Sequence, residues 1–147
     1  MLRIILATAS LLLLLVLAGC DDSDSSPTEP TDEPPEEVPT VTETFEGVVA
    51  QTGSSSHNFM VANVGIIRFG LTELEPLGTI TMGLGIGNPS ETDPEQCELF
   101  ARDDSVRAGQ VLQATATRAA AYCVSVLDVG NIFPDQQISY TLTVTHP

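Results

Sequence analysis

The stretch TITMGLGI (residues 79–86) alternates between polar or small residues and apolar ones. Isoleucine, methionine and leucine take every second position, with threonine and glycine between them. Successive side chains of a β-strand point to opposite faces of a sheet, so this pattern predicts a strand with one face in a core. The same alternation recurs in SYTLTVT (139–145), which places Tyr140, Leu142 and Val144 on one inward face.

Similar short runs surround these two segments, separated by turn-forming residues. We expect further strands over 42–50, 57–61, 65–71, 96–101, 110–117 and around Tyr122, Val124 and Val126. The predicted turns are 52–54, 87–90, 102–105 and 129–131, where glycine, proline, asparagine, aspartate and serine gather. Residues 107–121 are rich in alanine, but Gly109 and the alternating threonines favour a strand over a helix. About eight short strands predict an all-β, antiparallel two-sheet sandwich over residues 41–147.

Three glycines on the strand around 79–86 raise a separate question. Gly83, Gly85 and Gly87 would leave its outer face without side chains. A bare stripe can admit a ligand or another stretch of backbone. It can equally accommodate an overlying loop, which is the interpretation that we favour.

The N-terminus predicts export. Arg3 is followed by an almost wholly apolar segment over 4–17, which is shorter than the roughly 20 residues that a membrane-spanning helix needs. Together with the small residues Ala18 and Gly19, this layout predicts a secretory signal peptide over 1–19. The alternative is a membrane anchor that is not removed.

The sequence Leu17-Ala18-Gly19-Cys20 resembles the lipobox of bacterial lipoproteins. The resemblance implies cleavage before Cys20, a diacylglyceryl group on its thiol and, commonly, an acyl chain such as palmitate on the new amino group. One acyl chain holds a protein only marginally at a membrane, whereas two or three hold it stably. Asp21 resembles the inner-membrane retention signal of enterobacterial lipoproteins, a rule that does not extend to all bacteria, so the choice of membrane is left open.

The segment after Cys20 predicts a disordered tether over 20–40. It contains five prolines, eight acidic residues and Val38 as its one apolar side chain beyond the cysteine. Such a composition cannot bury enough surface to offset the entropy of ordering. An extended chain of this length reaches on the order of 60 Å, which favours a spacer over an acidic docking motif.

Charge and cysteine usage narrow the function further. The chain has 20 acidic residues against five arginines and no lysine, a net charge of −15 that disfavours nucleic-acid binding.

With Cys20 lipidated, Cys97 and Cys123 remain, and in an exported protein they predict a disulfide. Closing such a loop contributes about 3–4 kcal/mol by the chain-entropy argument. Metal binding by the two thiols is the weaker alternative, since no histidine or cysteine cluster accompanies them.

Candidate catalytic residues are few. Ser55 and His57 would share one face of a strand, and with Asp128 they could be imagined as a hydrolase triad. No nucleophile elbow or oxyanion motif accompanies them, so we favour a serine-rich turn and predict no catalytic residue. His146, next to the C-terminal residue, is expected to be solvated.

Candidate ligand sites are also weak. The segment 88–95 contains Glu91, Asp93 and Glu95, and Asp103-Asp104 follow in a predicted turn, which could suggest calcium. Neither stretch has the spacing of a specific calcium loop, so solvated acidic turns are favoured and no metal or cofactor is predicted. Sugar-binding surfaces present exposed aromatic rings, yet tryptophan is absent and the pattern places both tyrosines in the core.

The C-terminal third resembles a known family. AYCVSVLDVG (121–130) followed by YTLTV (140–144), with GSSSHNF (53–59) and GIIRF (65–69), is similar to the bacterial pre-peptidase C-terminal domain. The resemblance covers about 45–147 and implies a jelly-roll-like β-sandwich without catalytic residues. We therefore expect a non-enzymatic, lipid-anchored binding or structural module of the cell envelope, with a protein partner. The alternatives are a calcium- or glycan-binding module and, with less support, a small hydrolase.

Overall fold

A computed structural model describes residues 38–93 and 95–147. The predicted signal peptide, Cys20 and most of the predicted tether lie outside the described residues. The described part contains eight strands: β1 (Val41–Ala50), β2 (Ser54–Val61), β3 (Gly65–Glu75), β4 (Met82–Pro89), β5 (Cys97–Val106), β6 (Val111–Ala116), β7 (Ala120–Leu127) and β8 (Gln137–His146). None of the residues described belongs to a helix long and apolar enough to cross a membrane.

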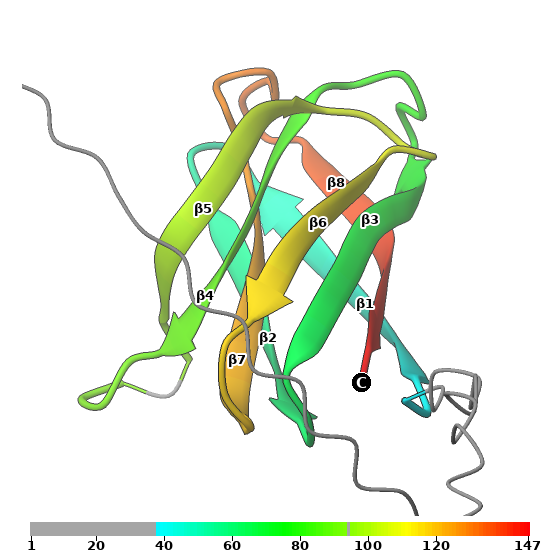
Figure 1. Cartoon of the computed structure of the whole chain (residues 1–147). Helices are drawn as coiled ribbons and strands as arrows, with labels where there is room; N and C mark the ends of the chain where they lie inside the picture. The colour runs from blue at the N-terminus through cyan, green and yellow to red at the C-terminus, as the bar shows by residue number, and fades with distance from the viewer. Residues whose placement is uncertain (1–37, 94) are drawn as a thin grey trace, which may run out of the picture. The chain divides into compact units, whose positions relative to one another are not determined.

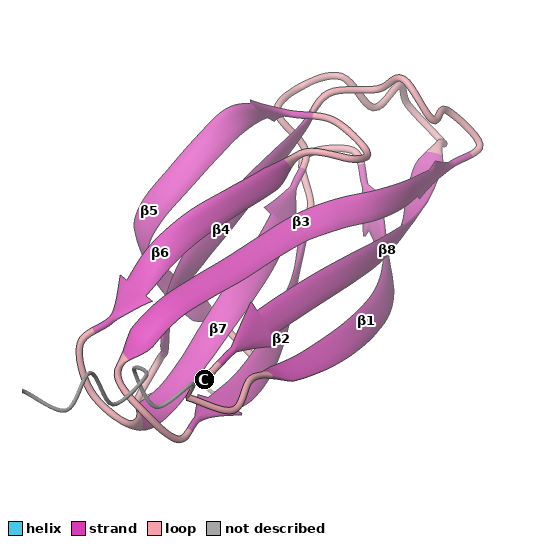
Figure 2. Cartoon of the chain, turned by 45° about the vertical axis from the view of Figure 1, so that its right-hand side comes forward, coloured by secondary structure: helices cyan, strands magenta, loops and turns pink. Residues whose placement is uncertain are grey.

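The strands form two antiparallel sheets packed face to face, with the orders β1-β8-β3-β6 and β2-β7-β4-β5 (Figure 1). Consecutive strands mostly lie in different sheets, which is the winding of a jelly roll. The predicted all-β sandwich is therefore confirmed. Figure 2 shows the first sheet from its outer side, with β6 and β1 at its two edges.

The core follows from the alternation in the sequence. Along β8, Ile138, Tyr140, Leu142 and Val144 are buried, while the residues between them face outward. The partner face is built by Met82, Leu84 and Ile86 of β4 and by Tyr122, Val124 and Val126 of β7. Burial of apolar surface at about 25 cal/mol per Å² is the main force holding the two sheets together.

Several predicted boundaries were wrong. β2 begins at Ser54, so residues 54–56 are strand and not the favoured serine-rich turn, and β3 continues past residue 71 to Glu75. Three further errors lie around β4 and β5. Residues 79–81 precede β4 instead of opening it, and the predicted turn at 87–90 is still strand as far as Pro89. The predicted turn at 102–105 lies inside β5. The register between β4 and β5 shifts twice, and bulges of this kind let polar, irregularly patterned residues remain in an edge strand. The alternation on which the sequence prediction depends is lost there.

The glycine stripe of β4 is covered, but mainly by the neighbouring strand β5 and not by the overlying loop that the sequence favoured. A Cβ atom at Gly85 would lie 2.7 Å from Leu99 Cδ1, and one at Gly87 would lie 2.1 Å from the carbonyl oxygen of Glu98. At Gly83 the nearest atoms belong to Asp104 and Val129. The strand β5 therefore passes close over β4, and no ligand-sized space is left above the glycines.

The predicted disulfide between Cys97 and Cys123 is present, with a Cα–Cα distance of 5.8 Å. It joins β5 to β7, although β4 lies between these strands in the sheet. The approach depends on Gly87, because the backbone of Glu98 and Leu99 crosses where its side chain would stand. A disulfide in this position fits an extracytoplasmic location.

Candidate functional site

Asp128 organises two loops at one end of the sandwich. One carboxylate oxygen accepts hydrogen bonds from the backbone N–H groups of Gly130, Asn131 and Ile132 at 2.9–3.1 Å. The other accepts from Thr52 N at 2.8 Å. Desolvation raises the pKa of Asp128, but these four hydrogen bonds outweigh it and hold the pKa below its ordinary value. The carboxylate thus ties the β1–β2 turn to the β7–β8 loop, a structural role.

Asp128→Ala is expected to lower the free energy of unfolding by about 1–2 kcal/mol at neutral pH, a figure that allows for solvent screening of the site. Because the folded-state pKa is depressed, this contribution is present above the ordinary value of 3.8 and is lost as the pH falls through the folded-state value. Urea unfolding at pH 7 and pH 3 measures the difference. Asp128→Asn, which keeps one acceptor oxygen, should lie between the two proteins; an equal loss at both pH values would contradict the assignment.

Ser55 and His57 do face the same side, but their partner is a tyrosine. The Tyr140 hydroxyl donates to Ser55 Oγ at 2.7 Å, and His57 Nε2 lies 2.7 Å from the same hydroxyl oxygen. Since the phenol has one proton, the His57 N–H donates to Tyr140. Burial lowers the pKa of His57, and burial raises the pKa of Tyr140 although its Ser55 hydrogen bond lowers it. Both groups are therefore neutral at pH 7.

The triad considered from the sequence is not assembled. His57 pairs with Val124, four residues along β7 from Asp128, which is about 13 Å of extended chain. The ring of His57 instead stacks on Phe45 with centroids 4.9 Å apart. Because Phe45 belongs to β1 and His57 to β2, this pair closes the seam between two edge strands of opposite sheets.

The prediction that His146 is solvated was wrong. Its side chain is buried, its ring centroid lies 5.2 Å from that of Phe59, and Nε2 is 2.9 Å from Glu43 Oε1. The sequence separation of 103 residues between His146 and Glu43 explains why no local pattern indicated this contact. The end of β8 is thereby fastened to the start of β1.

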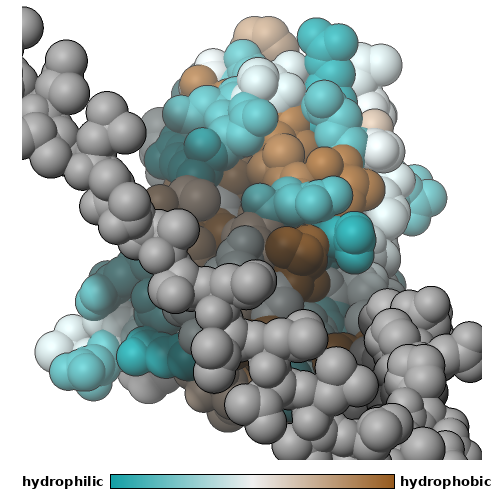
Figure 3. Space-filling model, in the orientation of Figure 1, coloured by the Kyte–Doolittle hydropathy of each residue, from teal (hydrophilic) through white to brown (hydrophobic). Residues whose placement is uncertain are grey.

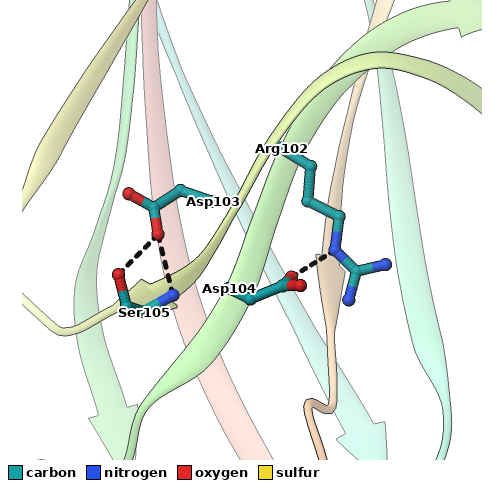
Figure 4. Close-up of polar contacts among 4 residues, drawn as sticks. All are labelled: Arg102, Asp103, Asp104 and Ser105. Carbon is teal, nitrogen blue, oxygen red and sulfur yellow. Dashed lines mark hydrogen bonds and ion pairs between the residues drawn. The ribbon is translucent and has the colours of Figure 1, made fainter.

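Three of the five acidic residues considered for calcium have side chains engaged in local contacts. Asp103 accepts from the backbone N–H and hydroxyl of Ser105, and these bonds, the hydroxyl first, hold its pKa below the ordinary value. Asp104 pairs with Arg102 (Figure 4). Asp93 accepts from the Glu95 backbone N–H. Among the residues that the structure describes, no group of three or more His, Cys, Asp or Glu could hold a metal ion.

An acidic hollow of about 480 Å³ lies on the outer face of the first sheet. Glu46, Glu73 and Glu75 line it, together with the hydroxyl residues Ser139 and Thr141. All three glutamates are exposed, so water screens their charges. The described residues that line this hollow do not form a binding site for a specific ligand.

Two other hollows, of about 380 and 580 Å³, adjoin at Asn88 and Arg118, and they form the candidate site. The smaller is lined by Asn88, Phe100, Thr115, Thr117, Arg118 and Tyr122. Phe100 is 53% exposed, and its ring meets Tyr122 edge-on with centroids 6.4 Å apart. This arrangement offers an apolar floor beside a guanidinium group, a combination enriched in protein-binding surfaces.

Arg118 is available to a ligand. Of the four arginines in the described part of the chain, only Arg102 forms an ion pair. Arg118 is exposed in the β6–β7 turn, where its own carbonyl accepts from the Tyr122 hydroxyl at 3.3 Å. Figure 3 shows apolar surface in the middle of the face that carries β6, bordered by hydrophilic residues.

Sequence reasoning missed Phe100 and Arg118. The prediction that Tyr122 and Tyr140 are buried is confirmed, but the phenylalanines were not considered as exposed rings. The available signal was the run CELFAR at 97–102, where apolar and charged residues do not alternate. A run of this kind is typical of an edge strand with bulges, whose side chains are not sorted cleanly between core and solvent.

No protein-family model and no curated protein matches this sequence. Among solved structures, the chain is similar to the Yersinia pseudotuberculosis-derived mitogen (TM-score 0.51, 12% identity, 73% of this chain and 86% of that chain). It is also similar to PliG, a periplasmic inhibitor of g-type lysozyme from Aeromonas hydrophila (TM-score 0.50, 13% identity, 70% of this chain and 83% of that chain). At these identities the likeness shows the fold alone.

Proposed function

We propose that this chain is a non-catalytic, lipid-anchored module of the bacterial cell envelope that binds another protein. The observation that carries the proposal is Phe100, a half-exposed aromatic ring beside Arg118, which has no ion pair in the described part of the chain. Aromatic and arginine side chains dominate the binding energy of protein interfaces. The Ser55, His57 and Asp128 side chains are meanwhile held by structural hydrogen bonds.

The anchor rests on sequence. The segment Leu17-Ala18-Gly19-Cys20 resembles a lipobox, and the proline-rich acidic segment that follows would space the sandwich from the lipid head groups. The disulfide supports export from the reducing cytoplasm. The resemblance to the pre-peptidase C-terminal domain remains a proposal of ancestry and adds no site residue.

The similar folds support a protein partner. PliG is by its description an inhibitor of a lysozyme, so a sandwich of this shape can act by contacting another protein. We carry over to this chain only that mode of action, because the two sequences are 13% identical. The target of this chain is a separate question.

Photo-crosslinking in intact cells tests the proposal. A photoreactive residue in place of Thr117, next to Arg118, should give one discrete crosslinked protein in the membrane fraction. The matched control is Met60, which is 64% exposed on the edge strand β2 and should give none. Mass spectrometry of the wild-type protein should find a chain that begins at an acylated Cys20, and Cys20→Ser should abolish both the acylation and the cleavage.

A smear of crosslinks from both positions, or none from Thr117, would rule out a specific protein partner at this surface. A wild-type protein with an intact first 19 residues and an unmodified Cys20 thiol would rule out lipid anchoring. The two readouts are independent, so one part of the proposal can fail without the other.

A further inference from the structure

The sandwich has two seams, where edge strands of opposite sheets face one another. The two seams differ in whether an aromatic contact joins the facing strands. At the β1–β2 seam, Phe45 stacks on His57 and closes the gap. At the β5–β6 seam, the aromatic contact that the described residues give to the corresponding ring of Phe100 lies within its own sheet, with Tyr122. Leu112 and Ala114 of β6 are turned toward the core yet remain partly exposed. The second seam therefore leaves apolar surface open to solvent.

Among the described residues, the edge of β6 has no partner strand. β6 ends its sheet and pairs there on one side only, with β3, so alternate residues direct their N–H and C=O groups away from the sheet. Its sequence VLQATA contains neither charge nor proline. Edge strands normally carry charges, prolines or bulges that prevent pairing with another chain, as β1 and β5 do with their acidic residues.

Three arginines flank this edge, while Glu91 and Glu98 line the larger hollow together with one of them, Arg118. Arg107 precedes β6, Arg118 follows it, and Arg68 lies beside Gln113 on the adjacent strand. In the described residues none of these three guanidinium groups has a carboxylate within ion-pair distance. A strand of six residues is about 20 Å long, so all three can act on one bound segment.

We propose that the free edge of β6 pairs with an extended segment of the partner protein that carries acidic and apolar side chains at alternate positions. The inference rests on the proposed protein-binding function and specifies the chemistry of the partner. Backbone hydrogen bonds to β6 supply the pairing, as in other cases of strand addition. Apolar side chains fill the hollow over Phe100, and carboxylates on the other face meet Arg68 and the two flanking arginines.

A second copy of this chain fits the edge poorly. Antiparallel pairing of two β6 strands would bring Arg107 of one copy next to Arg118 of the other, and parallel pairing would align each arginine with itself. Like charges placed opposite one another across a sheet are destabilising. The acidic segment 21–37 of the same chain contains four prolines, which lack the N–H groups that strand pairing requires.

The test uses the mature lipidated protein in detergent and a synthetic peptide of about nine residues, which is within the range of strand lengths and can span β6. The peptide alternates glutamate with valine and has one central phenylalanine; fluorescence anisotropy measures its binding. Arg118→Gln and Phe100→Ala should each weaken binding about tenfold. Arg102→Gln and Phe133→Ala, which alter an ion-paired arginine and an exposed ring elsewhere, should leave it within about twofold.

Two peptide controls separate the contribution of the peptide's negative charge from that of its backbone hydrogen bonds. Replacing glutamate with lysine should abolish binding, and N-methylation of alternate residues on the pairing edge should do the same because it removes the hydrogen-bond donors. Binding that survives N-methylation would overturn strand pairing. No binding of the parent peptide, or equal weakening by Arg102→Gln, would overturn the site.

Other occupants give distinct results. Dimerisation in sedimentation velocity that Phe100→Ala abolishes would replace the partner with a second copy. Peptide binding that appears only after residues 21–37 are deleted would assign the edge to that segment. If the envelope crosslink from position 117 persists in Phe100→Ala and Arg118→Gln while the peptide fails to bind, the β6 proposal is wrong and the protein-binding function stands.

Discussion

Replacing both Cys97 and Cys123 with alanine is expected to lower the free energy of unfolding by about 3–4 kcal/mol. The bridge closes a loop with a sequence separation of 26 residues, and its removal returns that conformational freedom to the unfolded chain. A domain of this size has a total stability on the order of 5–15 kcal/mol, so the loss is a large fraction of it. Urea unfolding monitored by circular dichroism measures the change.

The effect should be largest in β5. Cys97 is the first residue of this edge strand, and β5 pairs in its sheet only with β4, through a register that shifts twice. Without the disulfide, Phe100 and its neighbours depend on that irregular pairing alone. We therefore expect hydrogen exchange to accelerate in β5 before it does so in β8, which lies between two partners.

Reduction supplies the control. Dithiothreitol should destabilise the wild-type protein by a similar amount and leave the double-alanine variant unchanged. A double variant as stable as the oxidised wild type would show that packing over β4, and not the covalent bond, holds β5 in place.

The regular parts of the fold could be predicted because local sequence and burial agree there. In β8 every second residue is buried, and in β7 the alternate residues Tyr122, Val124 and Val126 join the core although the residues between them are buried too, so the period of two in the sequence gives both strand and face. The disulfide followed from cysteine count and compartment. The order of strands within the two sheets was not predicted, because alternation does not specify which strands pair.

The candidate site could not be predicted, because it arises where that agreement breaks down. Phe100 lies in a bulged edge strand whose pattern does not separate core from solvent, and its exposure depends on the open seam with β6. Arg118 is distinguished by having no ion pair among the described residues, and this depends on where the fold places the other charges. His146 was misjudged for the same reason: its environment comes from Glu43, at the opposite end of the domain sequence.

Gly87→Ala is expected to destabilise the sandwich by about 3 kcal/mol, although alanine is ordinarily the better residue in regular structure. The new Cβ would lie 2.1 Å from the Glu98 carbonyl oxygen and 2.8 Å from Leu99 Cα. Both contacts are backbone atoms, so no side chain can rotate away and β5 itself must move. Gly78→Ala is the matched control, because its nearest neighbour would be 3.5 Å away; it should change the urea midpoint little.

The two predictions are physically coupled, which provides a sharper test than either alone. The disulfide holds the start of β5 over Gly87, so it prevents the movement that would relieve the clash of a new methyl group. In the variant lacking both cysteines, β5 is freer to shift, and Gly87→Ala should cost less by about 1 kcal/mol. Strict additivity in the double-mutant cycle would mean that the close approach of β5 to β4 is set by β5 packing, independently of the covalent bond.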